Sequence, residues 1–299
     1  MNKVVIFGAN GQLGRTLVET LKPQATLVPV TRSGMLFDNS RCGSADFQDT
    51  QSICTLLDQE RPTKVINAAA YTAVDKAENA SALAVQINAT APGAIAQWCA
   101  SNCVPFIHYS TDYVFDGTSS TPYLTNSKVS PLGVYGSSKQ AGEQAIQAAG
   151  GHSLILRTAW VYSAYGHNFL LTMLKLAQQH STIRVVADQF GTPTSTAIIA
   201  DATAHILSQP LQGYNIGHVT ATGETSWHGF AEAIFTLAYE RKLLNRRPEV
   251  VPISTAQYPT PARRPAYSVL DTQSTIAQFQ LQLPNWHCAL RTTLDTFPK

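Results

Sequence analysis

Charged side chains are scarce in this 299-residue chain, because only 13% of its residues are Asp, Glu, Lys or Arg, against roughly 25% in soluble proteins. The 21 basic and 19 acidic residues leave a net charge of +2, without a run of like charge. This scarcity argues against a partner of nucleic acid and against a polybasic membrane-binding patch. The sequence also lacks a stretch of about 18 apolar residues, so it predicts no membrane-spanning helix.

Cysteine and histidine show no pattern of disulfides or metal ligands. The five cysteines are an odd number without CxxC spacing, and the eight histidines lack paired spacing. We therefore expect no metal site of this kind and reduced thiols, as in a cytoplasmic protein. The N-terminal apolar run, Val4–Phe7, is too short for a signal-peptide core and leads into a glycine turn.

Short β-rich runs alternate with longer helical patterns over the first two-thirds of the chain. The expected strands are 3–7, 26–30, 64–68, 104–109 and 153–157, and the expected helices are 12–22, 50–60, 80–102 and 139–149. Strands buried on both faces of a parallel sheet have this short, Val- and Ile-rich character. The alternation therefore predicts an α/β fold with a doubly wound parallel sheet of the Rossmann type.

The pattern loosens after about Thr158. Helical patterns continue at 168–180, 196–208 and 229–242, but proline and glycine become frequent between and after them. We expect residues 1–158 to form mainly a dinucleotide-binding domain. Residues 159–299 are expected to form mainly a smaller substrate-binding lobe, with segments that return to the sheet.

A glycine-rich turn joins the first expected strand to the first expected helix. Its sequence is Gly8-Ala9-Asn10-Gly11-Gln12-Leu13-Gly14. In this context one glycine permits the tight turn, one lets the backbone approach a pyrophosphate, and one lets the helix pack on the strand. The helix N-terminus offers free N–H groups to the phosphates. The motif predicts dinucleotide binding rather than a plain structural turn.

The end of the second expected strand bears on the choice of cofactor. A carboxylate there would bind the ribose hydroxyls of NAD, but the sequence reads Val30-Thr31-Arg32-Ser33. Arg32 is suited to a 2′-phosphate, which favours NADPH over NADH; the alternative is a solvated arginine. Asp46, which precedes a helix with Phe47, is interpreted either as an adenine contact or as a helix N-cap.

A Tyr-x-x-x-Lys pair, Tyr135 and Lys139, opens another expected helix, so both side chains share one face. A phenol has a pKa near 10, and a neighbouring ammonium lowers it enough for general acid–base chemistry. The strand before this helix ends in Ser110 and Thr111, where ligands bind in doubly wound sheets. Either hydroxyl can bind a substrate carbonyl, and spacing does not choose between them.

Taken together, the glycine motif, the strand-end hydroxyl and the Tyr-x-x-x-Lys pair resemble the extended short-chain dehydrogenase/reductases. Within them, the chain looks most like the dTDP-4-dehydrorhamnose reductase family over nearly its whole length. The segments that carry this resemblance are 67–78, 109–117, 157–162, 188–194 and 261–271, and the most specific are Ser110-Thr111-Asp112-Tyr113-Val114-Phe115 and the last segment.

The resemblance implies roles for individual residues. Catalysis would fall to Thr111, Tyr135 and Lys139, and Asn88 matches a helix asparagine that supports a proton relay; its alternative is a buried structural residue. Cofactor contacts would fall on Gly8, Asn10, Gly11, Gln12, Leu13, Gly14, Arg32, Asp46, Phe47, Ala69, Ala70, Tyr71, Thr72, Tyr109, Tyr135 and Lys139. Substrate contacts would fall on Val74, Thr111, Asp112, Tyr113, Trp160, Arg263 and Arg264. Trp160 is expected to place its indole against the deoxysugar, and one or both arginines to clamp the diphosphate.

The same resemblance implies NADPH-dependent reduction of the C4 keto group of dTDP-4-dehydro-L-rhamnose, giving dTDP-L-rhamnose for cell-surface polysaccharide. Family members are associated with Mg²⁺ and with a homodimer, but Arg15 and Asp188 in that neighbourhood form no evident carboxylate cluster. Two alternatives stay open. One is an NADP-binding regulatory subunit like methionine adenosyltransferase β, and the other is a different sugar-nucleotide reductase or epimerase.

Overall fold

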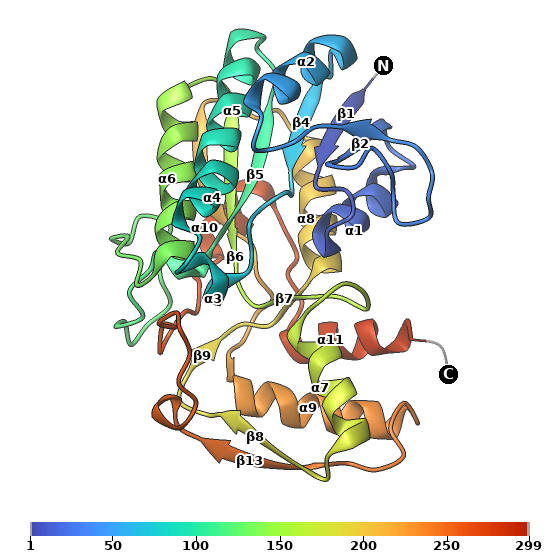
Figure 1. Ribbon diagram of the computed structural model, residues 1–299, viewed down its shortest axis with the longest axis vertical. Coiled ribbons are helices and arrows are strands. Elements are labelled where there is room, and N and C mark those ends of the chain that lie inside the picture. Colours follow the sequence, from blue (N-terminus) through green and yellow to red (C-terminus); the bar gives the residue numbers. More distant parts are fainter. Residues whose placement is uncertain (1, 298–299) are drawn as a thin grey trace.

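A parallel seven-stranded sheet forms the centre of the computed structural model, which describes residues 2–297 (Figure 1). The strand order is β11-β6-β5-β4-β1-β2-β3, so the order reverses beside β1. The strands are β1 (Lys3–Phe7), β2 (Thr26–Thr31), β3 (Gly43–Ser44), β4 (Lys64–Asn67), β5 (Phe106–Thr111), β6 (Ser153–Thr158) and β11 (Tyr214–His218). This reversal brings the carboxyl ends of β1 and β4 together at the sheet edge where doubly wound proteins bind ligands.

The sheet is buried on both faces, as its alternating side chains show. Val4 and Ile6 pack with helices α1 (Gln12–Leu21) and α8 (Thr196–Leu207). Val5 and Phe7 point to the opposite face, which is covered by α2, α5 and α6. The bounds on that face are α2 (Thr50–Glu60), α3 (Val74–Ala77), α4 (Ser81–Val85), α5 (Ala91–Ser101) and α6 (Val134–Ala149). The predicted doubly wound α/β fold is therefore confirmed.

The helix expected over 80–102 is present from Ser81 to Ser101, but its α-helical hydrogen bonding is interrupted in the middle. A π-helical turn, Gln86–Thr90, separates α4 from α5. Pro92 explains the interruption, because proline has no N–H to donate to the carbonyl of Asn88 four residues earlier. Gly142 of α6 lies against that same carbonyl, since a Cβ there would be 2.1 Å from the Asn88 oxygen.

Helix α6 begins at Val134, five residues before the expected start at Lys139. Its N-cap, Gly133, has no side chain to bind the free N–H groups of the first turn. Glu78, which follows α3, supplies the missing acceptor, because its Oε1 accepts the Val134 N–H at 2.9 Å. A capping residue 56 positions away in the sequence leaves no local signal.

A second lobe lies below the sheet in Figure 1 and has its own hydrophobic core, which includes Leu170, Phe230, Phe235 and Leu290. It contains α7 (Phe169–Gln179), β8 (Thr182–Val186), α9 (Trp227–Glu240), β13 (Glu249–Ile253) and α11 (Trp286–Asp295). Its smaller elements are β7 (Val161–Tyr162), β9 (Phe190–Gly191), β10 (Thr194–Ser195) and β12 (Thr225–Ser226). Helix α10 (Gln273–Phe279) packs instead on the central sheet, beside β11. Within residues 2–297, every helix is too short or too polar to cross a membrane.

Candidate active site

The glycine turn after β1 has the geometry of a phosphate cradle. Gly8 has φ +79°, and a Cβ there would lie 2.5 Å from the backbone nitrogen of Ala69. A Cβ on Gly14 would lie 2.1 Å from the Gly8 oxygen, so α1 approaches β1 this closely only with glycine. Gly11 caps α1 without a side-chain hydrogen bond. The first N–H groups of α1 are therefore placed to bind an anionic pyrophosphate.

A pocket of about 360 Å³ extends from this turn across the carboxyl ends of β1 and β2. It is lined by predicted cofactor residues, namely Gly8, Asn10, Arg32, Asp46, Phe47, Ala69 and Ala70, together with Thr31, Ser33 and Ile87. Arg32 is exposed here. These residues fit the adenosine half of a dinucleotide. The glycines and small side chains leave room for it in the pocket, and the Arg32 side chain lies at the rim of the pocket.

Asp46 is not the N-cap of α2, which corrects one of its two interpretations. Asp49 takes that role and accepts the Gln51 N–H at 3.0 Å. The Oδ1 atom of Asp46 accepts the Gln48 N–H instead, in a turn just before the helix. Asp46 therefore lies in the wall of the pocket, three residues earlier than a cap would require.

The side chains of Gln12 and Tyr109, two predicted cofactor contacts, are engaged elsewhere. Gln12 Nε2 donates to the carbonyl of Val161 at 3.2 Å, and its Oε1 accepts from Ser163 and Asn168 at 3.3 Å. Tyr109 is buried and its hydroxyl bonds Thr203 at 2.8 Å. The backbone of both residues lies near the site. The side chain of Gln12 connects α1 to the segment after β6, and the side chain of Tyr109 connects β5 to α8.

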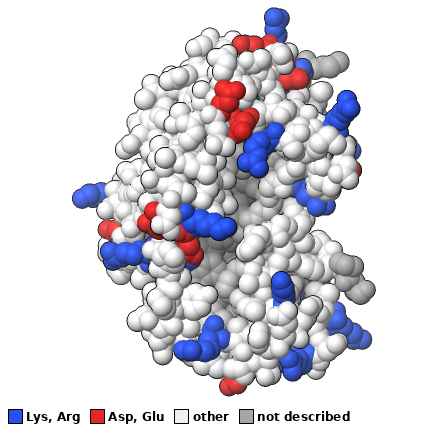
Figure 2. Space-filling view, in the orientation of Figure 1, with Lys and Arg blue, Asp and Glu red and all other residues white. Residues whose placement is uncertain are grey.

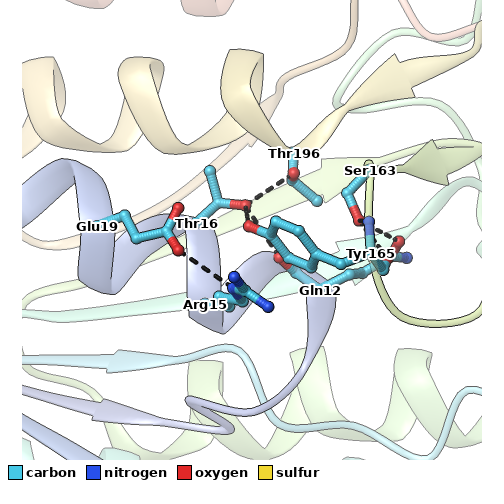
Figure 3. Close-up of polar contacts among 7 residues, drawn as sticks. All are labelled: Gln12, Arg15, Thr16, Glu19, Ser163, Tyr165 and Thr196. Carbon is cyan, nitrogen blue, oxygen red and sulfur yellow. Dashed lines mark hydrogen bonds and ion pairs between the residues drawn. The ribbon is translucent and has the colours of Figure 1, made fainter. Parts of the chain in front are cut away.

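The contacts of Gln12 belong to a larger polar cluster that sequence reasoning missed (Figure 3). Thr16 bonds the hydroxyl of Tyr165 and donates to Thr196 at 2.8 Å. Arg15 pairs with Glu19 and lies 4.2 Å from the Tyr165 ring centroid. These residues come from α1, α8 and the loop after β7, which are far apart in sequence. The cluster fixes that loop against the helix that carries the phosphate cradle.

The predicted catalytic residues come together beyond the end of β5. Thr111 is the last residue of β5, and its hydroxyl, which donates to Asp112 at 3.0 Å, lies close enough to Tyr135 on α6 to lower the pKa of that phenol. Lys139, one turn further along α6, is 2% exposed, and its Nζ donates to the Tyr109 carbonyl at 2.6 Å. Ser110 points away from them and donates to buried Glu143 at 2.6 Å. The structure therefore brings Thr111, rather than Ser110, to the Tyr-x-x-x-Lys pair.

Burial dominates the electrostatics of this group. It raises the pKa of Tyr135 to about 12, against a smaller lowering by the Thr111 hydrogen bond. It lowers the pKa of Lys139 to about 8, although the Glu143 charge acts in the opposite direction. Burial also raises the pKa of Asp112, beside Thr111, to about 6. In this state Tyr135 is a phenol over the whole neutral range, in contrast to the lowered pKa that the sequence predicts from a neighbouring ammonium.

The loop after β4 is held by two asparagines. Asn67 Oδ1 accepts the Ala69 N–H at 2.9 Å. Asn88, buried in the π turn, accepts the Tyr71 N–H at 2.8 Å and donates to Ser138 of α6 at 3.0 Å. Asn88 therefore connects the loop after β4 to helix α6. Thr72, the residue after Tyr71, is exposed.

Figure 2 shows a hollow near the middle of the molecule, and two of the predicted substrate residues contact the other lobe or the catalytic helix. Arg264 pairs with Asp75 of α3 at 2.8 Å, and Asp75 also accepts the Ala262 N–H. This ion pair links the two lobes beside Val74. Arg263 is exposed, whereas Arg264 is half-buried. Tyr113 packs edge-on against Tyr135 with ring centroids 5.5 Å apart.

The indole of Trp160, which is predicted to lie against the deoxysugar, is half-buried and partly covered by its neighbours. Its ring stacks on Trp227 at 3.5 Å and 4°. A Cβ on Gly191 would lie 2.4 Å from Cε2 of the same indole, so the backbone of Gly191 packs against the ring as well. Trp160 also has φ +47°, an uncommon backbone conformation for a bulky residue. This packing holds the indole in one position.

Metal ligands do not gather within residues 2–297, where no three His, Cys, Asp or Glu side chains form a group suited to a metal ion. Arg15 is engaged by Glu19, Phe37 and Tyr165, while Asp188 accepts from the backbone and hydroxyl of Thr255. Arg15 and Asp188, the two residues that the family resemblance places near a Mg²⁺ site, therefore contact different partners.

Comparison with known proteins places the chain in a family. Residues 1–298 match the family model described as the RmlD substrate binding domain. The chain is 42% identical to the dTDP-4-dehydrorhamnose reductase of Burkholderia thailandensis, covering 96% of each chain. It is 38% identical to that of Escherichia coli K12, covering 98% of this chain and 97% of the relative.

Solved structures agree with this assignment. The dTDP-4-dehydrorhamnose reductase of Bacillus anthracis in complex with NADP superposes with a TM-score of 0.90 at 33% identity, over 99% of both chains. The ortholog from Clostridium acetobutylicum gives 0.86 at 34% identity, over 98% of both chains. UDP-glucose 4-epimerase of Thermus thermophilus, in complex with NAD, shares only the fold, at 19% identity. The chain therefore belongs to the RmlD family, and the two relatives compared with it above by sequence are dTDP-4-dehydrorhamnose reductases.

Proposed function

We propose that this protein reduces the C4 keto group of dTDP-4-dehydro-L-rhamnose to give dTDP-L-rhamnose, with NADPH as the reductant. The observation that carries the proposal is that Thr111, at the carboxyl end of β5, lies near Tyr135, one helical turn from Lys139, in the same sheet whose β1 end forms the phosphate cradle. Relatives at 36–42% identity that are named for this activity support it.

NADPH, rather than NADH, is the cofactor that the binding pocket favours. The cradle of Gly8, Gly11 and Gly14 would hold the pyrophosphate, and Arg32 at the rim of the pocket would pair with the 2′-phosphate. The NADP in the Bacillus anthracis structure is consistent with this choice. When bound, the cofactor supplies the hydride.

The chain's own residues supply the proton and orient the sugar. Tyr135, kept as a phenol by burial, donates its proton to the oxygen that develops negative charge at C4. The Thr111 hydroxyl, which donates to Asp112 in the absence of substrate, turns its proton toward the same oxygen. Solvent then restores the proton of Tyr135, so the reaction consumes one hydride and one proton for each keto group.

The substrate diphosphate is assigned to Arg263. Arg264 already neutralises Asp75, so its charge is committed to the contact between lobes. Arg263 is exposed and free to form charge-assisted hydrogen bonds with phosphate oxygens. Arg263→Gln should raise the KM for the dTDP-sugar, whereas Arg264→Gln should lower the stability of the contact between lobes.

The direct test is consumption of NADPH in the presence of enzymatically generated dTDP-4-dehydro-L-rhamnose, followed by identification of dTDP-L-rhamnose. A parallel reaction with NADH ranks the two cofactors. NADPH binding without consumption would favour the regulatory-subunit alternative or another keto sugar. Substrate conversion without net loss of reductant would favour an epimerase.

A further inference from the structure

The first turn of α6, which carries Tyr135, depends on a distant side chain for its cap. Its N-cap residue, Gly133, has an extended backbone and no side chain that could accept a hydrogen bond from the first free N–H groups. The half-buried carboxylate of Glu78 accepts the Val134 N–H at 2.9 Å instead. Tyr135 directly follows Val134, so Glu78 holds the backbone beside the catalytic tyrosine.

The first turn of α6 is packed closely from two sides. A Cβ on Gly133 would lie 2.6 Å from Oε1 of Glu78, and a Cβ on Gly136 would lie 2.2 Å from the carbonyl oxygen of Tyr113. The Tyr113 N–H donates to Oγ1 of Thr111 at 3.2 Å. The turn therefore lies between Glu78 and the segment that continues from the catalytic threonine. Its position sets how the catalytic tyrosine faces that threonine.

The short helix α3, which precedes Glu78, also contacts the second lobe. Asp75 of α3 accepts from Nη2 of Arg264 at 2.8 Å and from the Ala262 N–H at 3.2 Å. Ala77 is fully buried, and α3 packs on α6. Two carboxylates three residues apart, Asp75 and Glu78, therefore connect α3 to the second lobe and to the catalytic helix.

We propose that Glu78 is a positioning residue, which holds the first turn of α6 so that Tyr135 and Thr111 face the same keto oxygen. Asp75 connects this placement to the second lobe through α3. The expected effect on turnover rests on the proposed reductase function, whereas the placement of Tyr135 does not depend on the substrate. Proton transfer depends on this geometry, because a displacement of about 1 Å at an active site costs up to about 100-fold in rate.

The surroundings of Glu78 allow the carboxylate to be removed without unfolding the helix. Glu78 lines an open cavity of about 390 Å³ together with Gly133, Val134 and Ser137. This space admits water, which would bind the Val134 N–H when the carboxylate is absent. Water does not connect α6 to α3, however. We therefore expect a folded variant whose melting temperature is lower by about 2–4 °C, as for loss of a helix cap, and whose main defect is in turnover.

Two substitutions at Glu78 separate the hydrogen bond from the charge. Glu78→Ala removes the acceptor, and kcat for each NADPH-binding site should fall by about 10-fold to 100-fold. The KM for NADPH should stay nearly unchanged, because the phosphate cradle lies on α1. Glu78→Gln retains an oxygen that accepts the same N–H, so it should keep most of the turnover. Expressing kcat for each NADPH site, counted by fluorescence titration, corrects for any loss of folded protein.

Asn285→Ala is the matched control for loss of a helix cap. Asn285 is the N-cap of α11 in the second lobe, and its Oδ1 accepts the His287 N–H at 2.9 Å. This variant should lose about as much thermal stability as Glu78→Ala and retain its kcat. An equal loss of kcat in Asn285→Ala and Glu78→Ala would overturn the proposal, because it would show a general effect of stability.

Carbon NMR of the whole enzyme with ¹³C-labelled tyrosine rings tests the placement of Tyr135 without substrate. Loss of a signal in Tyr135→Phe assigns that ring. We expect the Tyr135 signal to move in Glu78→Ala and to stay near its original position in Glu78→Gln and Asn285→Ala. Since Glu78→Gln also removes the charge, a shift of equal size in both Glu78 variants would overturn the role of the hydrogen bond. An unmoved signal in Glu78→Ala would overturn the proposal as a whole.

A double-mutant cycle tests the connection through α3. Asp75→Ala should lower kcat in the otherwise unchanged enzyme and have little further effect in Glu78→Ala, because α3 then no longer holds α6. Losses that multiply in the double variant would overturn the role of Asp75.

The NMR result is separate from that of the reductase assay. An enzyme that fails to reduce the proposed sugar but shows the expected shifts of Tyr135 would refute the proposed function and leave the role of Glu78 standing.

Discussion

The buried ion pair between Glu143 and Arg157 allows a stability prediction with a definite magnitude. Two hydrogen bonds of 2.6 and 2.8 Å join the side chains, which are 5% and 2% exposed, and Ser110 donates to the same carboxylate. Glu143→Gln keeps the size of the side chain but removes its charge. The guanidinium is then buried without a counter-charge, which costs about 3–5 kcal/mol of unfolding free energy.

Thermal and urea unfolding measure this loss. At roughly 2 °C per kcal/mol for a chain of this size, the melting temperature of Glu143→Gln should fall by about 6–10 °C. Glu60→Gln is the matched control, because Glu60 pairs with Lys3 at the surface with about a third of each side chain exposed. Its cost should stay below about 1 kcal/mol. A Glu143→Gln variant no less stable than Glu60→Gln would refute the reasoning.

Four further predictions concern the site. Tyr135→Phe should lower kcat by about 10²–10⁴-fold, as loss of a general acid does, while fluorescence titration shows NADPH binding retained. Gly14→Ala should abolish NADPH binding in the same titration, because its Cβ would lie 2.1 Å from the Gly8 oxygen. Arg32→Ser should weaken NADPH about 10-fold or more, as loss of a charge-assisted hydrogen bond does, and leave the KM for NADH nearly unchanged. Burial raises the pKa of Asp112 to about 6, above the value near 3.9 of an unfolded chain. The folded state therefore binds the extra proton, and the contribution of Asp112 to stability falls as pH rises from about 4 to 6; Asp112→Asn should remove this part of the pH dependence of urea unfolding.

Features that depend on local sequence were predictable. The five expected strands agree with β1, β2, β4, β5 and β6 to within two residues at each end, because strands buried on both faces leave short apolar runs. The glycine turn could also be located from local sequence, because its three glycines must fall within seven residues. The sequence order of strands and helices then implied which strand ends meet.

Features that depend on distant partners were not predictable from these patterns. The start of α6 depends on Glu78, and the break before α5 depends on the single proline at position 92. Strands β8 and β13 pair with each other across more than sixty residues and leave weak local signals. Likewise, Asn67 and His108 come from adjacent strands, and the sequence shows neither their contact nor its direction.

Trp160 shows why the role of a residue is harder to infer than the fold around it. The family resemblance gives Trp160 the role of a stacking surface for a sugar. In the structure, Trp227 and Gly191 pack against the indole, and a positive φ aims it there. Such a backbone conformation costs of order 1–3 kcal/mol and persists only when the surrounding packing compensates for it. Because Trp227 and Gly191 supply that packing from the second lobe, Trp160 connects the end of β6 to that lobe, and a change at any of the three residues should disturb how the two lobes are joined.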